Sequence, residues 1–116
     1  MMDVPNISNG EWQIIKVLWN RSPLTAADIV SEIQKSKVCS PRTIKTLLRR
    51  LIAKGAVVYT VDEKDSRIYH YKPTITEEEC LHKVNEEFLN IHYAGNIANM
   101  MEVFTEQYGY STAIQK

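Results

Sequence analysis

The 116-residue sequence lacks most of the motifs that mark enzymes and metal proteins. Its two cysteines, Cys39 and Cys80, belong to no CxxC pair or Cys/His cluster, so reduced structural thiols are expected. There is no glycine-rich phosphate loop, HExxH or nucleophile elbow. The three histidines are not spaced as paired helical ligands. These absences predict a protein that is not an enzyme and that uses neither a metal nor a cofactor.

Long apolar runs are also missing. No stretch approaches the roughly 18 apolar residues of a membrane helix, and no charged-then-apolar segment opens the chain. We therefore expect a cytoplasmic protein without membrane association. The length fits one domain, or a small domain with an appendage.

A net charge of zero conceals an uneven distribution of charged residues. Up to Ile75 there are 12 lysines and arginines against 7 acids, and from Thr76 there are 2 against 7, which together give the 14 and 14 of the whole chain. A basic part joined to an acidic part suggests that the first binds nucleic acid and the second has another role.

Two short amphipathic helices are predicted near the N-terminus. Ser8 with Glu11, and Thr25 with Asp28, have the spacing of capping boxes. Apolar residues recur at helical spacing after each, and the segment 21–23 separates the two helices. The tryptophans of the first helix are expected in the core rather than in a stacking platform. A short connector over 35–39 then leads to a third helix.

The third helix carries the clearest sign of function. Ser40 suits the N-cap, Pro41 the first turn and Gly55 the position after the end. One face is apolar, while the other is basic and contains no acid, which suggests a polyanionic partner. A solvated surface is the alternative for this helix alone. Two helices, a connector and a basic amphipathic helix form the helix-turn-helix pattern.

A β-hairpin is predicted next, with strands over 56–61 and 67–72 and a polar turn between them. Pro73 is expected to end the second strand. His70 is expected to be an exposed strand residue. A hairpin directly after a helix-turn-helix predicts a winged helix. Lys64 and Arg67 near the tip could reach a phosphate backbone, although the neighbouring acids argue for a modest contribution.

The acidic part predicts two helices with apolar stripes, over 76–92 and 97–108, and a short loose tail over 110–116. The pair is too small to enclose a core, so its stripes must pack on the winged helix or on another chain. We favour another chain. The predicted dimerisation residues are Leu81, Val84, Phe88, Ile97, Met100, Met101 and Phe104.

With these residues identified, the chain resembles the penicillinase-repressor family, the BlaI/MecI group with its copper-responsive CopY relatives. The most specific matching segments are 8–12 with 18–19, 40–51, and 54–55. The segments 69–71 and 93–95 also fit. The resemblance covers the chain from Ile7 to about Ser111.

The resemblance implies a cytoplasmic homodimeric repressor of β-lactam-resistance or related genes, which binds a palindromic operator in double-stranded DNA. It places base and phosphate contacts on Arg42, Thr43, Thr46 and Arg50. The full predicted DNA-binding set is Arg42, Thr43, Lys45, Thr46, Arg49, Arg50, Lys64 and Arg67.

The resemblance also implies a sensor protease as a further partner, which in the β-lactam branch cuts an Asn-Phe bond. The matching pair here is Val103-Phe104, in which the Asn is replaced, so cleavage by that route is in doubt. The paired CxC motif of the copper branch is absent. The C-terminal end is shorter than is usual in the family.

Together these observations predict a mainly α fold with a small β-hairpin. Residues 1–73 form a winged-helix DNA-binding domain, and residues 74–116 form a helical dimerisation region. A copper-type repressor of the same family is one alternative. A winged helix that binds proteins and not DNA is another, against which the basic face of the third helix argues.

Overall fold

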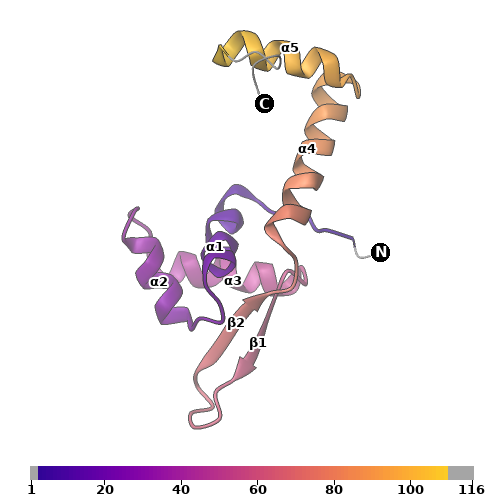
Figure 1. The fold of residues 1–116 in the computed structure, drawn as a ribbon. Helices are drawn as coiled ribbons and strands as arrows, with labels where there is room; N and C mark the ends of the chain where they lie inside the picture. The colour runs from indigo at the N-terminus through magenta and orange to yellow at the C-terminus, as the bar shows by residue number, and fades with distance from the viewer. Residues whose placement is uncertain (1–2, 110–116) are drawn as a thin grey trace. The chain divides into compact units, whose positions relative to one another are not determined.

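The computed structural model describes residues 3–109, and the predicted loose tail over 110–116 lies outside them. The fold is mainly α with one β-hairpin, as predicted (Figure 1). In chain order the elements are α1 (Asn9–Asn20), α2 (Ala26–Gln34), α3 (Pro41–Ala53), β1 (Val57–Val61), β2 (Tyr69–Pro73), α4 (Glu77–Tyr93) and α5 (Ile97–Tyr108).

Local capping explains why the first helices begin where they do. Ser8 and Glu11 form the predicted capping box of α1, and Thr25 and Asp28 form that of α2. At α3, the Ser40 hydroxyl accepts a hydrogen bond of 3.1 Å from the Thr43 N–H, with proline in the first turn. Each side chain satisfies a backbone donor that has no partner within the helix.

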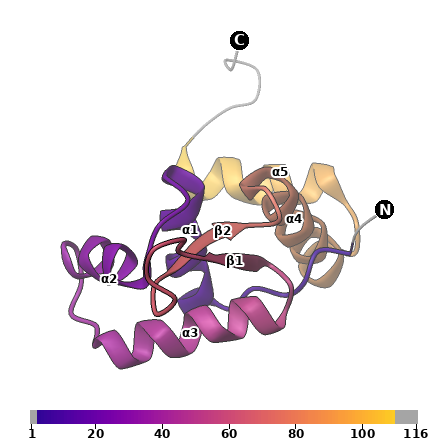
Figure 2. The ribbon, with the colours of Figure 1, turned by 90° about the horizontal axis from the view of Figure 1, so that it is seen from below.

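The hydrophobic core lies among α1, α2, α3 and the hairpin. The three helices contribute Ile14, Ile15, Leu18, Ile29, Ile44 and Leu51 to it, and Ala56 and Val57 at the start of the hairpin are equally buried. Trp12 and Trp19 are partly buried against this core and meet edge to face at 5.3 Å, which supports the prediction that they serve packing. Figure 2 shows α3 running alongside the hairpin, with α1 packed on α3.

The hairpin is antiparallel, with Val57 opposite Pro73 and Val61 opposite Tyr69. Three of its predicted bounds were wrong: the first strand begins at Val57, one residue later than predicted, and the second strand is shifted at both ends. The second strand begins at Tyr69 and not at residue 67, because Arg67 is held in the turn by Asp65. Pro73 belongs to the strand as its last residue, a position where a missing N–H is tolerated.

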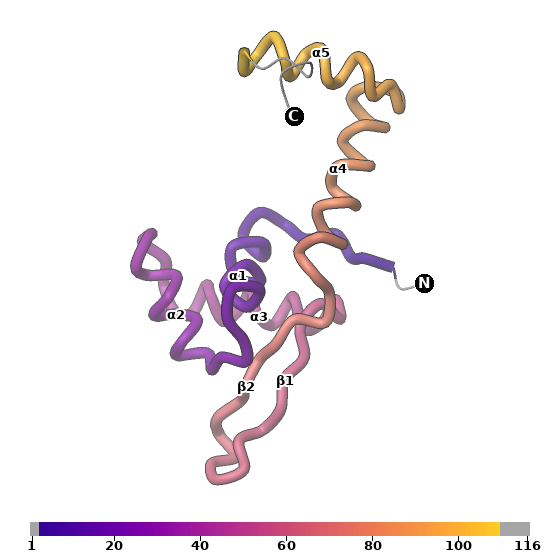
Figure 3. Tube along the Cα trace, viewed as in Figure 1, coloured from indigo at the N-terminus to yellow at the C-terminus, as the bar shows by residue number. Residues whose placement is uncertain are grey.

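The described residues divide into two compact units, one up to Cys80 and one from Leu81. The first unit extends past Pro73, where the sequence predicts the domain boundary, because Ile75 and Cys80 are buried in its core. The Trp19 indole N–H donates to the Ile75 carbonyl at 2.8 Å, and Lys16 pairs with Glu77 at 3.0 Å. Figure 3 traces the chain from β2 into α4.

The second unit contains most of α4, followed by α5. Asn96 caps α5 by accepting a hydrogen bond of 2.9 Å from the Asn99 N–H. Gly109 ends the helix in the left-handed conformation, at φ 73°. The Phe88 and Phe104 rings lie 6.3 Å apart, so the two helices contact each other through aromatic side chains.

Candidate nucleic-acid interface

One face of α3 is basic and open to solvent. The predicted DNA-binding residues Arg42, Thr43, Lys45, Arg49 and Arg50 are all exposed, and Thr46 is partly exposed. The opposite face buries Ile44, Leu48 and Leu51 in the core. The helix contains no acidic residue. Burial of the apolar stripe therefore presents a surface with a uniformly positive charge.

The two threonines of this surface are positioned by local hydrogen bonds. The Thr43 hydroxyl accepts a bond of 3.0 Å from the Ser40 hydroxyl, so it keeps its own proton for a ligand. The Thr46 hydroxyl donates at 3.0 Å to the Arg42 carbonyl, so its lone pairs remain available. One hydroxyl can thus donate and the other can accept.

The conformation of the turn at the tip of the hairpin is stabilised by hydrogen bonds to its two aspartates, Asp62 and Asp65. Asp62 accepts hydrogen bonds of 3.0 Å from the N–H groups of Lys64 and Asp65. Asp65 and Arg67 form a bidentate ion pair, with both N···O distances at 3.0 Å. This pair lowers the pKa of Asp65 and raises that of Arg67. The positive charge of Arg67 is therefore shared with Asp65, whereas the Lys64 side chain is exposed.

His70 differs from its predicted state as an exposed strand residue. It is partly buried, and its Nε2 lies 2.9 Å from Asp62 Oδ1. The hydrogen bond from His70, together with those from the turn N–H groups, lowers the pKa of Asp62. His70 therefore connects the second strand to the turn.

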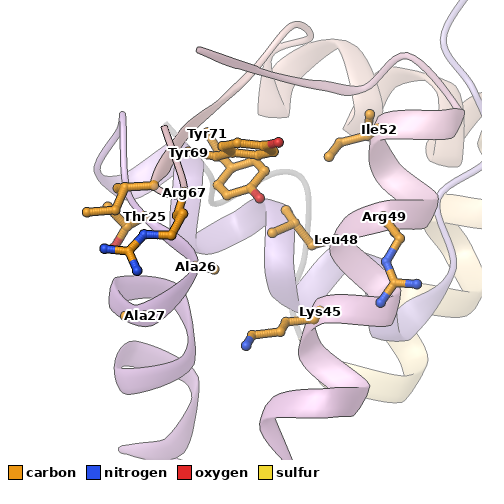
Figure 4. Close-up of a pocket in the computed structure, with 11 residues that line it drawn as sticks. Thr25, Ala26, Ala27, Lys45, Leu48, Arg49, Ile52, Arg67, Tyr69 and Tyr71 are labelled. Carbon is orange, nitrogen blue, oxygen red and sulfur yellow. The ribbon is translucent and has the colours of Figure 1, made fainter. Parts of the chain in front are cut away.

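A groove of about 490 Å³, which we call the wing groove, lies in the first unit (Figure 4). The start of α2, one side of α3 and β2 with the residues before it form its walls. Its lining includes the apolar side chains Leu48, Ile52, Ile68, Tyr69 and Tyr71. Lys45, Arg49 and Arg67 also line it. The helical periodicity of the sequence did not predict this groove, because its walls come from three separate segments.

An ion pair near the end of α3 was also absent from the sequence prediction. The Glu11 side chain is only 2 % exposed, and its Oε1 accepts hydrogen bonds from the Lys54 ammonium and from the Ser8 N–H at 3.0 Å. Lys54 also donates at 2.7 Å to the Asn6 carbonyl. The start of α1 and the end of α3 are thus tied together by one lysine.

Residues 3–109 contain neither a membrane-spanning helix nor a cluster of metal ligands. Within that range no helix combines the length and the apolar character needed to span a bilayer. No group of three or more His, Cys, Asp or Glu side chains in the same range could hold a metal ion.

Comparison with known proteins identifies the family. The pattern of the penicillinase repressor family matches residues 7–113, nearly the whole chain. The chain belongs to the penicillinase repressor family. This is a family of transcriptional repressors and not of enzymes.

Individual relatives support this assignment to the penicillinase repressor family. The chain is 35 % identical to the penicillinase repressor of Bacillus licheniformis, over 91 % of this chain and 80 % of that protein. It is 33 % identical to the methicillin resistance regulatory protein MecI of Staphylococcus aureus strain N315, over 87 % and 80 % respectively.

A solved structure of a family member extends the comparison to the fold. The solution structure of monomeric B. licheniformis BlaI in complex with the blaP half-operator is 37 % identical to this chain. The match covers 68 % of this chain and 93 % of that one, with a TM-score of 0.55. The winged-helix fold of this penicillinase repressor family member is therefore shared with a relative solved on DNA.

Proposed function

We propose that this protein is a transcriptional repressor that binds an operator in double-stranded DNA. In this proposal α3 enters the major groove, where base edges carry a distinct pattern of donors and acceptors. Arg42, Thr43, Thr46 and Arg50 contact bases and nearby phosphates. Lys45 and Arg49 on α3, with Lys64 and Arg67 on the wing, contact the DNA backbone.

The exposed face of α3 carries this proposal. Four side chains of this helix are positively charged, namely Arg42, Lys45, Arg49 and Arg50, and none is acidic. The opposite face of the helix is packed in the core. Such a charge pattern would be repulsive without a polyanion, because like charges one turn apart destabilise a helix. The family relative solved on a half-operator supports DNA as that polyanion.

The wing is expected to contribute less than α3. Arg67 must exchange the carboxylate of Asp65 for a phosphate, although an ion pair at such an exposed position is weak and is readily exchanged. Lys64 has no such requirement, because no ion pair to its side chain is found in the described part of the chain. We therefore propose Lys64 as the main phosphate contact of the wing.

We further propose that the protein acts as a homodimer through α4 and α5. Six of the seven predicted dimerisation residues are between 36 % and 60 % exposed, namely Leu81, Val84, Phe88, Ile97, Met101 and Phe104, and Met100 is partly exposed. Covering the rest of each side chain with a partner contributes on the order of 1 kcal/mol. A two-fold dimer would also present two copies of α3 to a palindromic operator.

The proposed targets are β-lactam-resistance or related genes, as the names of the relatives suggest. The proposed location of the protein is the cytoplasm. A further proposed partner is a sensor protease of the kind that acts on repressors of the β-lactam branch. We propose that it cuts this chain poorly. Val103 stands before Phe104 in α5 where the β-lactam branch has asparagine, so the residue preceding the scissile bond differs.

Selection from a random-sequence duplex library, followed by salt-titrated fluorescence anisotropy, tests DNA binding. We expect one enriched palindromic sequence. The logarithm of the binding constant should fall linearly with the logarithm of the salt concentration. If all six basic candidates of one subunit contact phosphate, the slope should reach about −5 for each bound subunit, and it should be shallower if fewer do. An absence of any enriched sequence together with a salt slope near zero would refute the proposal.

A further inference from the structure

The wing groove has an apolar and aromatic lining, which is not required for contacts with a DNA backbone. Its lining contains two aromatic rings, Tyr69 and Tyr71, beside the aliphatic side chains of Leu48, Ile52 and Ile68 (Figure 4). A phosphate is recognised by cations and N–H donors, which need no apolar surface nearby. The volume of about 490 Å³ lies in the range of small-molecule pockets. The lining therefore favours a ligand with an apolar body.

The aromatic part of the groove is organised before any ligand arrives. Tyr69 stacks on Tyr59 with ring centroids 4.5 Å apart and an interplanar angle of 2°. Tyr71 is partly buried, and its backbone is fixed by two hydrogen bonds with Leu24, of 2.8 and 3.0 Å. Burial raises the pKa of Tyr71, so its phenol stays protonated at neutral pH. A flat ring would meet a preformed surface, which limits the entropic cost of binding.

The charged part of the groove favours an anion. Lys45 and Arg49 project from α3, and in the described part of the chain neither is engaged in an ion pair (Figure 4). Arg67 is already paired with Asp65, so the first two supply the available charge. No acidic side chain lines the groove. Ala26 and Ala27 add the first turn of α2 to the lining, but Asp28 already places a carboxylate in that turn, so the attraction for an anion comes from Lys45 and Arg49.

We propose that the wing groove binds a small aromatic carboxylate, with its ring beside Tyr69, Tyr71 and Leu48 and its carboxylate facing Lys45 and Arg49. Because these two cations also belong to the proposed DNA-binding surface, occupancy of the groove competes with operator binding. The competition rests on the proposed function, whereas the binding itself does not. The ligand is therefore an inducer that acts by displacement.

The first experiment titrates the full-length, ¹⁵N-labelled protein without DNA. Three probes are compared by NMR: 2-naphthoate, its neutral amide 2-naphthamide, and inorganic phosphate. We expect saturable shifts of the Ala27, Leu48 and Ile68 amides with 2-naphthoate, and at least about fivefold weaker binding of the amide. Titration to about 5 mM detects even weak binding, with a Kd of about 1 mM.

A pair of variants tests whether the groove itself holds the probe. Ala27→Asp places a carboxylate on the groove wall, in the first turn of α2 where the helix dipole tolerates it. Asn9→Asp adds the same charge to the first turn of α1, at an exposed residue that lines neither this groove nor the hollow beside it around Lys45. The first should weaken 2-naphthoate binding about tenfold, and the second by less than about twofold, because repulsion declines with distance and screening.

A competition experiment measures the effect on DNA. With 2-naphthoate at ten times its Kd and strictly competitive binding, the apparent Kd should rise about elevenfold for a half-site bound by one subunit. For a palindromic operator bound by both subunits of the proposed homodimer, it should rise roughly 120-fold. Simultaneous binding without any change in operator affinity would overturn the inducer assignment. Failure to bind DNA without the probe would instead count against the proposed function, and the NMR titration would stand independently.

Each other result of the titration is decisive. Equal affinity for the amide would show that Lys45 and Arg49 do not select an anion. If phosphate bound as tightly as 2-naphthoate, the groove would be a binding site for DNA phosphates and the proposal would be wrong. No saturable shift, or equal weakening by Ala27→Asp and Asn9→Asp, would also overturn the proposal.

Discussion

Replacement of Lys54 by methionine is expected to destabilise the winged helix by more than an ordinary surface substitution does. The variant leaves the Glu11 carboxylate, which is 2 % exposed, without its countercharge, and it removes the hydrogen bond to the Asn6 carbonyl. Removing one partner of a buried pair costs roughly 3–5 kcal/mol. The Lys54 side chain is 34 % exposed, so nearby water lowers our expectation to about 2–3 kcal/mol.

The matched variants separate charge from capping. Glu11→Gln keeps an oxygen for the Ser8 N–H and removes the charge, so it should cost only about 1 kcal/mol. The double variant Glu11→Gln with Lys54→Met no longer buries an unpaired charge. Its cost should therefore be lower than the sum of the single costs by about 1–2 kcal/mol.

The stability difference between the wild type and Lys54→Met should also depend on pH in a defined direction. Burial acts to raise the pKa of Glu11, but hydrogen bonds from Lys54 and Ser8 outweigh it, so the pKa lies below its ordinary value of 4.5. A group whose pKa is lowered on folding stabilises the protein above that ordinary value, and the contribution is lost as the pH falls through the folded value. The difference between the wild type and Lys54→Met should therefore be greatest near neutral pH and narrow towards pH 4.

Urea unfolding followed by circular dichroism, at one fixed protein concentration, measures these differences. A cost below about 0.5 kcal/mol for Lys54→Met at pH 7 would be typical of an ordinary surface site. That result, or a difference that does not change between pH 7 and pH 4, would refute the reasoning about the buried pair.

Three further predictions concern DNA, assembly and proteolysis. Arg42→Ala should cost roughly 1–3 kcal/mol on the preferred operator and relax its sequence preference, whereas Lys64→Ala should weaken all sequences alike and reduce the salt slope by about 1, as anisotropy can measure. Truncation after Cys80 should give a folded monomer that binds a half-site weakly, and sedimentation showing a dimer would contradict it. A β-lactam-type sensor protease should leave the Val103–Phe104 bond intact, and fragment masses corresponding to a cut there would overturn that expectation.

The elements were predictable from the sequence because their signals are local. The helix starts are specified by contacts within one turn, made by Ser8 with Glu11 and by Ser40 with Pro41 beside it. The structure confirms both of these starts. The apolar stripe of α3 likewise fixed which face would be buried. The exposed face with its basic residues, which is the candidate site, followed directly from that periodicity.

The remaining features depend on contacts between distant residues. The pair of Glu11 with Lys54 joins positions 43 apart in the sequence, and no periodicity relates them. The burial of Ile75 and Cys80, which extends the first unit, requires the core to be assembled. The wing groove similarly exists only after α2, α3 and β2 have packed. The hairpin bounds shifted because Asp65 recruits Arg67 into the turn.

The contact between Trp19 and Ile75 gives the molecule a built-in optical probe. The Trp19 indole donates at 2.8 Å to a carbonyl 56 residues away, directly before α4, and lies edge-on to Trp12 at an angle of 77°. Replacing Trp12 with phenylalanine would leave Trp19 as the single tryptophan of the chain, at the junction where the hairpin leads into α4. Its emission maximum would then report whether this junction stays closed while the protein binds DNA, without any attached dye.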